Sequence, residues 1–171
     1  MSVKWYVLRS KPNKELILWR ELTARGLESY CPQLRVRPAD PRNRKVLPYF
    51  PGYLFLHVDL EQLGISTLQW MPYSSGLVSF DNAPASVPEN LVQAIRRHVE
   101  QINAAGAEEI AGLQHGDPVI IQGGPFEGHE AIFDVRLPGR ERVRVLLKLL
   151  QPREVSLELP AAQVQKKKKR R

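Results

Sequence analysis

The chain has 171 residues, 43% of them hydrophobic and 25% charged, and this composition excludes a chain that is disordered throughout. No apolar run approaches the roughly 20 residues of a membrane helix, and the first residues lack the layout of a signal peptide, so we expect a cytoplasmic protein. The formal net charge of +7 favours a polyanionic partner, nucleic acid or a nucleoprotein machine, although residues 166–171 alone contribute six positive charges.

The first third of the chain predicts a strand, a helix and an extended segment. Aromatic and β-branched residues predict a strand over residues 4–9. Apolar residues at helical spacing then predict a helix that is N-capped by Asn13 and ends at Gly26. Residues 28–36 are predicted to be extended. They include Cys31, the single cysteine, which excludes an internal disulfide, has no zinc-ligand cluster around it and is interpreted as a small buried residue.

Residues 35–46 form a basic segment interrupted by prolines, and we expect a flexible hairpin tip or loop. Two interpretations remain open for it. The charges are either solvated or belong to an arm that contacts phosphates. The candidate nucleic-acid contacts in this segment are Arg42, Arg44 and Lys45.

Residues 48–58 hold the densest aromatic cluster of the chain. Pro51 and Gly52 predict a turn, and the residues that follow predict a strand over 53–58. Because side chains alternate along a strand, Leu54 and Leu56 are assigned to the core and Tyr53 and Phe55 to the opposite face. We expect part of this cluster to be exposed for a partner, which is the signature of an interaction site.

The remaining elements of the first half predict an α+β fold. Apolar spacing predicts a short helix within residues 59–71, interrupted at Gly64, then a strand over 77–80. A longer helix should begin at Pro88 and end near Gly106. The order β-α-β-β-α-β-α suits a split-βαβ sandwich, with helices on one face of an antiparallel sheet.

The second part of the chain changes character. Residues 105–113 lack periodicity and are predicted to be a linker between a first domain, 1–104, and a second, 114–165. Five short segments punctuated by glycine and proline predict strands of a small SH3-like β-barrel, among them residues 142–147. We expect the basic residues 166–171 to be a disordered tail.

Three motifs in this order resemble the NusG family of transcription elongation factors. They are Trp5-Tyr6-Val7, then Phe50-Pro51-Gly52-Tyr53, and, after the linker, Gly116-Asp117 with Gly124-Pro125-Phe126-Glu127-Gly128. The resemblance spans nearly the whole chain. It implies a NusG N-terminal domain followed by a KOW barrel. The candidate partner-binding element of the barrel is the turn formed by Gly124, Pro125, Phe126 and Gly128. Within this turn, Phe126 is expected to fill the end of the barrel.

The resemblance also implies a binding mechanism. NusG proteins dock an apolar patch of the N-terminal domain on the β′ clamp of RNA polymerase, so the anchor candidates here are Phe50, Tyr53 and Phe55. Details such as Tyr53-Leu54-Phe55 are similar to specialised paralogues of the RfaH type. That comparison adds further candidates: Arg9 in the clamp patch, Ser66 and Thr67 at the polymerase gate loop, and Lys14 and Arg20 for non-template DNA or RNA.

Residues 140–151 have a second interpretation. Leucines and valines among arginine and lysine are compatible with a helix as well as a strand. KOW domains of the RfaH type refold between a helical hairpin and a barrel, and a helical form would cover the apolar residues around Phe50 until a partner displaced it. The valines and prolines of the domain favour the barrel.

No catalytic constellation is present, because the four histidines are scattered and no phosphate-binding glycine loop occurs. We therefore predict no enzyme activity, no cofactor and no metal, and a monomer that promotes elongation or antitermination. The barrel would recruit a second partner, ribosomal protein S10 or Rho. The alternative is a structural, ribosome-associated RNA-binding KOW protein; a DNA-binding repressor ranks last because no helix-turn-helix is evident.

Overall fold

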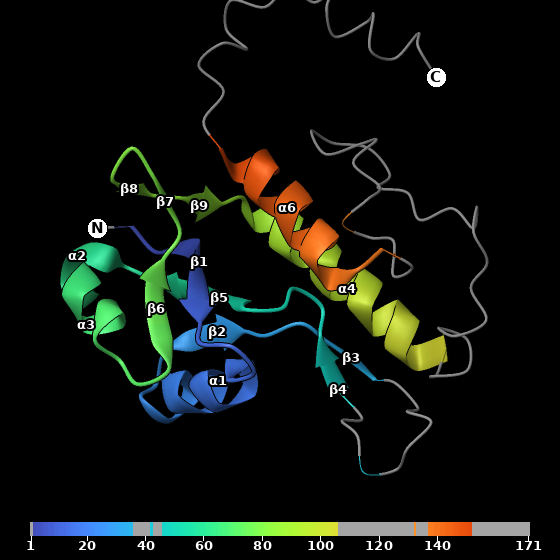
Figure 1. Ribbon diagram of the computed structural model, residues 1–171. Coiled ribbons are helices and arrows are strands. Elements are labelled where there is room, and N and C mark those ends of the chain that lie inside the picture. The colour runs from blue at the N-terminus through green and yellow to red at the C-terminus, as the bar shows by residue number, and fades with distance from the viewer. Residues whose placement is uncertain (1, 36–41, 43–45, 106–131, 133–136, 152–171) are drawn as a thin grey trace, which may run out of the picture.

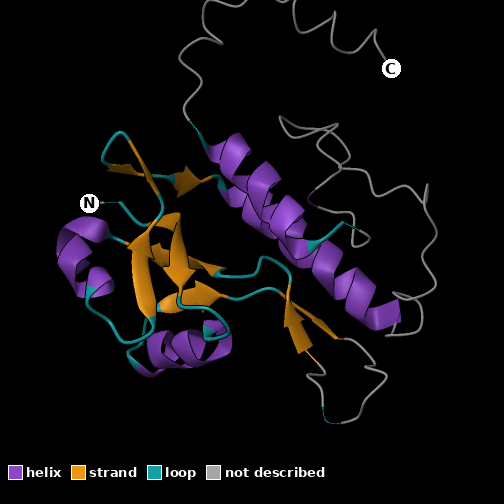
Figure 2. Cartoon of the chain, viewed as in Figure 1, coloured by secondary structure: helices purple, strands orange, loops and turns teal. Residues whose placement is uncertain are grey.

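The computed structural model describes residues 2–35, 42, 46–105, 132 and 137–151, and these build an α+β fold around one antiparallel sheet (Figures 1 and 2). The five-stranded sheet has the order β2-β5-β1-β6, with β9 also paired to β1. Its strands are β1 (Lys4–Ser10), β2 (Glu28–Tyr30), β5 (Tyr53–Val58), β6 (Ser74–Leu77) and β9 (Ser86–Val87). The predicted α+β class is confirmed.

Strand β1 lies at the centre of this sheet because its residues are apolar on both faces. It pairs with β5 from Lys4 opposite Val58 to Arg9 opposite Tyr53, and with β6 and β9 on its other side. Four consecutive side chains, from Trp5 to Leu8, are buried. Alternation along β1 therefore sends side chains into two separate apolar clusters, one on each face of the sheet.

The first face is covered by elements close in sequence to the strands. Helix α1 (Glu15–Ala24) buries Leu18 and Leu22 there, and α3 (Ile65–Gln69) buries Leu68. They pack against Leu54 and Leu56 of β5, as the alternation predicted. Helix α1 begins after Lys14, which is its N-cap residue and makes no side-chain cap hydrogen bond, so the prediction of Asn13 as the N-cap is wrong. The backbone of Asn13 is left-handed, with φ of 61°.

The second face is covered by two helices that lie alongside one another (Figure 1). Helix α4 (Glu89–Ala105) contributes Leu91, Val92, Ile95 and Val99, and α6 (Gly139–Leu150) contributes Val143 and Leu146. Both helices share one apolar cluster with Trp5, Val7 and Phe55 of the sheet. Helices thus cover both faces, and the prediction of helices on one face is wrong.

Short elements connect these layers. Gly64, with φ of +89°, separates α2 (Leu60–Leu63) from α3, where the sequence predicted an interruption. The predicted strand over 77–80 is divided instead between the end of β6 and β7 (Ser79–Phe80), which pairs with β8 (Ala83–Pro84).

A hairpin of β3 (Gln33–Arg35) and β4 (Val46–Pro48) extends from the sheet and is attached to α4. The side-chain amide of Asn103 donates to the carbonyl of Gln33, and its oxygen accepts from the N–H of Arg35, both over 2.9 Å. One α4 side chain therefore occupies the edge of β3 as a neighbouring strand residue would.

Residues 142–147, predicted as a barrel strand, lie within helix α6, so the helical interpretation of this segment is the observed one. The physical reason is visible in the pattern: Val143, Leu146 and Leu150 recur at helical spacing and face the second cluster, whereas Arg140, Arg144 and Lys148 face solvent. The other four predicted barrel strands, the linker and the tail lie wholly or almost wholly outside the described residues. Within the described part of the chain, no helix has the length and apolarity needed to cross a membrane.

Candidate partner-binding surface

The aromatic segment before β5 forms a tight turn. The N–H of Tyr53 donates to the carbonyl of Phe50 over 3.0 Å, and Gly52 has φ of +85°. Proline followed by a residue with positive φ is the requirement of a type II turn, which Pro51 and Gly52 satisfy. The turn predicted from the sequence is confirmed.

Two contacts attach this turn to the rest of the fold. The N–H of Gly52 donates to a carboxylate oxygen of Glu15 over 2.7 Å, and the N–H of Ser10 donates to the carbonyl of Gly52 over 2.8 Å. Glu15 is buried, and a carboxylate in that setting needs such a donor. The sequence gives no signal for this role, because the partner of Glu15 is a backbone group.

The rings around the turn pack edge to face. The Tyr49 and Phe50 centroids are 4.9 Å apart at 80°, and those of Phe50 and Phe55 are 5.9 Å apart at 81°. Phe50 and Phe55 are each 1% exposed, whereas Tyr53 is half-buried. The prediction that Phe50 and Phe55 are exposed is wrong. Both rings are buried in the second cluster, together with residues of α4 and α6. We call Tyr49, Phe50, Pro51, Gly52, Tyr53 and Phe55 the docking segment.

Helix α6 covers the docking segment through a buried arginine. The Nε of Arg142 donates to the carbonyl of Tyr49 over 2.9 Å, and its guanidinium lies 4.4 Å from the centre of the Tyr49 ring. The side chain is 4% exposed and also donates to the carbonyl of Leu137. The Tyr49 hydroxyl in turn donates to the carbonyl of Ile132. Planar stacking combined with a directed donor is a geometry that lysine does not reproduce.

The N-terminus of α6 approaches the turn very closely. A Cβ atom added to Gly139 would lie 2.5 Å from Cγ of Pro51, so any side chain at this position requires the turn or the helix to move. Gly139 therefore permits the contact between the helix and the docking segment. We call α6 the lid.

Arg9 is the other predicted polymerase-binding residue that lies near the docking segment. It pairs with Tyr53 across the sheet, is exposed, and donates from Nη2 to the carbonyl of Ser75 over 3.2 Å. Ser66 and Thr67 are exposed on α3, which packs on the first face, so the structure does not bring them together with Phe50. The Thr67 hydroxyl donates to the carbonyl of Leu63.

The candidate nucleic-acid residues are dispersed. Lys14 precedes α1 and Arg20 lies on it, and both are exposed, as is Arg42. Arg44 and Lys45 lie outside the described residues, as do the candidate KOW residues Gly124, Pro125, Phe126 and Gly128.

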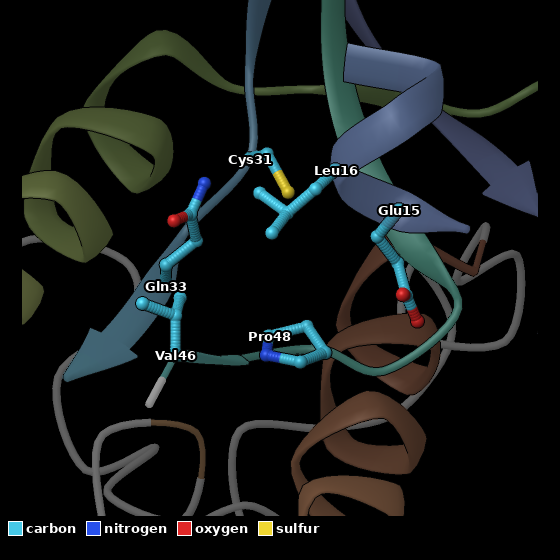
Figure 3. Close-up of a pocket in the computed structure, with 6 residues that line it drawn as sticks. All are labelled: Glu15, Leu16, Cys31, Gln33, Val46 and Pro48. Atoms are coloured by element: carbon cyan, nitrogen blue, oxygen red, sulfur yellow. The ribbon is translucent and has the colours of Figure 1, made fainter. Parts of the chain in front are cut away.

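A small hollow lies between α1 and the β3–β4 hairpin (Figure 3). Its empty space is about 200 Å³ including open solvent, below the roughly 300–1,000 Å³ of small-molecule sites. Cys31 faces it, and burial raises the pKa of this thiol to about 12, with Glu15 adding to the effect. A protonated, 4% exposed thiol is a poor nucleophile. No cluster of metal-ligating side chains occurs among the residues described.

Tyr30 links the hairpin side of the sheet to α4. Its ring stacks on Phe55 with centroids 6.2 Å apart, and the Arg96 guanidinium lies 4.2 Å from its centre. Burial raises the pKa of Tyr30, partly offset by Arg96, so the phenol stays neutral. This arrangement packs the protein interior and provides no acid or base for chemistry.

Comparison with known proteins identifies the family of the chain. The family model described as "Transcription termination factor nusG" matches residues 3–96, more than half of the chain. A solved structure titled "Domain interaction in Thermotoga maritima NusG" is 22% identical, with a TM-score of 0.45, and the match covers 74% of this chain and 76% of that one. The chain belongs to the NusG family of transcription elongation and termination factors.

Proposed function

We propose that this protein is a transcription elongation and antitermination factor that docks on the β′ clamp of RNA polymerase through the docking segment, with the lid controlling access. The observation that carries the proposal is the burial of an aromatic turn beneath a helix that lies about ninety residues further along the chain. An aromatic cluster held in a fixed turn has the composition of a binding hot spot.

Preorganisation supports the proposal. Glu15 and Ser10 hold the Gly52 turn on both sides, and β5 extends directly from it. The turn therefore keeps its shape if the lid leaves, since neither contact involves α6. A surface that is already ordered loses little conformational entropy when a partner binds.

The lid sets the apparent affinity. When only a fraction of molecules has the docking segment uncovered, the apparent dissociation constant rises by the reciprocal of that fraction. Arg142, Val143 and Leu146 bury the lid against the docking segment and α4, so the covered state dominates. Polymerase, or a recruiting signal, then selects the uncovered state.

Secondary contacts complete the proposed function. Arg9 lies beside the docking segment and joins the clamp contact, while Ser66 and Thr67, on α3, contact the gate loop. Residues 114–165, once released as a KOW barrel, recruit ribosomal protein S10 or Rho. The family match over 3–96 favours this transcription function over the ribosome-associated alternative.

Binding of the full-length protein to RNA polymerase tests the proposal, scored also by read-through of a terminator in vitro. Leu146→Arg places a charge on the buried side of the lid and so destabilises the covered state. Binding to polymerase should therefore tighten at least about tenfold, the equivalent of 1.4 kcal/mol. Arg144→Ala, on the exposed side of the same helix, is the matched control and should leave the affinity unchanged.

Docking variants complete the test in the Leu146→Arg background. Tyr53→Ala, at a half-buried position, and Phe50→Ala should each weaken binding more than tenfold, whereas Ile17→Ala, exposed on α1, should not. Circular dichroism verifies that each variant is folded. Unchanged affinity for Tyr53→Ala and for folded Phe50→Ala would remove the clamp contact from the proposal.

A further inference from the structure

The residues of the lid that are exposed to solvent are all cations. They are Arg140, Arg144 and Lys148, and the rest of α6 is buried or half-buried. Because these cations recur at every fourth residue, they follow one side of the helix, with a rise of about 6 Å from each to the next. We call these three residues the basic stripe.

The basic stripe has few acidic neighbours. Glu141, the single acid of α6, pairs with Arg144 over 3.0 Å, and no ion pair joins Arg140 or Lys148 to another residue in the described part of the chain. Helix α4, which lies alongside the lid (Figure 1), instead exposes both signs of charge, with Glu89 and Glu100 as well as Arg97. A single sign of charge is therefore particular to the lid.

The basic stripe opposes the helix that carries it. Like charges four residues apart repel one another on a helix. Arg140, the second residue of α6, also lies at the positive end of the helix dipole. The buried contacts of Val143 and Leu146 hold the helix in place but leave this repulsion unrelieved. A ligand with regularly spaced negative charges would relieve it, and so would stabilise the helix.

We propose that the basic stripe binds the phosphate backbone of single-stranded RNA, and that bound RNA holds the lid over the docking segment. The coupling follows from geometry. In the helix the cations are about 6 Å apart along the axis, whereas in a strand residues four apart are separated by about 13 Å. RNA that fits the closer spacing binds the covered state better, and only such a difference in affinity shifts the equilibrium.

RNA suits the basic stripe better than a protein or a duplex does. The core of a protein interface is apolar and depleted of charge, and the basic stripe offers cations alone. A helix reads duplex DNA by entering the major groove, but α6 is held by its inner side against α4 and the docking segment. A flexible single strand can follow the outer side of a helix that lies flat on the protein.

The consequence of RNA binding rests on the proposed function. The covered state is the one without polymerase, and the single strands that such a molecule meets are RNA, because separated DNA strands are held inside a transcribing polymerase. Linkage is reciprocal, so RNA on the basic stripe weakens docking on polymerase by the factor by which docking weakens RNA binding. RNA that is away from polymerase therefore keeps the protein in reserve.

Amide hydrogen exchange of the full-length protein with an oligouridine of about 12 nucleotides, without polymerase, tests the basic stripe. RNA at about ten times its dissociation constant should slow exchange in α6 about tenfold, while the amides of β1 and β5 keep their rates. Replacing both Arg140 and Lys148 with Gln should remove this protection. The same double variant should reduce the slope of log affinity against log salt by about 1.4.

Replacing both Lys4 and Arg97 with Gln is the matched control, because these exposed residues of β1 and α4 carry the same charge but lie off the lid. Residues 166–171 are present in every variant and contribute equally. This control should keep the protection of α6.

Four outcomes would each overturn the proposal. They are unchanged exchange in α6 with RNA, equal loss of protection in the control, and equal protection by duplex RNA or by polyglutamate. Each can be distinguished from failure of the proposed function, since the polymerase assay with Leu146→Arg contains no free RNA. Loss of polymerase binding in Tyr53→Ala, together with unprotected α6, would leave the docking segment in place and remove only the basic stripe.

Discussion

The two faces of the sheet are built from different parts of the chain. On the first face, α1 and α3 cover strands that lie within a few dozen residues of them, and leucine dominates the contact. On the second face, α4 shares the cover with α6, which comes from beyond residue 138 and reaches the docking segment through a buried arginine. The first face is an ordinary core, whereas half of the second is a contact that local unfolding can break.

The largest effect is expected from a substitution that disrupts the apolar cluster on the first face. Leu18→Ala removes a fully buried side chain of α1 and should lower the free energy of unfolding by about 2–5 kcal/mol. Chemical denaturation of the full-length protein measures it. If the midpoint moved no more than for Ile17→Ala, the first face would not be the stabilising one.

Leu146→Ala should have a different consequence at similar cost. Leu146 is also fully buried, so about 2–5 kcal/mol of packing is lost, but the loss should fall on the lid. Amide hydrogen exchange should speed up at least about tenfold in α6 while the amides of β1 and β5 keep their protection. Faster exchange in β1 as well would show that the lid and the sheet unfold together.

Arg142→Lys tests the contact between Arg142 and Tyr49, with a smaller expected effect. It keeps the charge but loses the stacking on Tyr49 and the directed Nε donor, which should destabilise the closed lid by about 1–3 kcal/mol. Exchange in α6 and polymerase affinity should increase together. Arg144→Lys, with its guanidinium mostly exposed and paired to Glu141, provides the comparison and should change neither.

The smallest effect uses Cys31 as a reporter of the first face. Its thiol pKa is raised from 9.0 to about 12, so folding favours the neutral thiol; this stabilisation is complete below about pH 9 and is lost as the pH rises further. Labelling by a disulfide reagent at pH 8 should be slow, accelerated by Leu18→Ala, and unaffected by Leu146→Ala. Acceleration by Leu146→Ala would contradict the separation of the two faces.

Sequence periodicity was sufficient for elements whose partners are near in the chain. The strand of β1, the helices α1 and α4, the turn at Pro51 and Gly52, and the inward assignment of Leu54 and Leu56 were all predictable from local spacing. The burial of Phe50 and Phe55 was not, because the cluster that buries them includes residues of the distant segment 139–150, where arginine and leucine permit both a helix and a strand. The exposure of Trp70, at 80%, was predictable, because this residue does not fit the apolar spacing that the buried residues Leu68 and Met71 follow.

Helix α4 belongs to the cover of the second face and is also attached, through the side-chain amide of Asn103, to strand β3. One end of the helix packs under the lid, and the other holds β3 with both hydrogen bonds of a missing strand neighbour. Because both hydrogen bonds come from one side chain, any displacement of α4 that keeps them also displaces β3. The cover of the second face and the β3–β4 hairpin therefore share α4 as a common support.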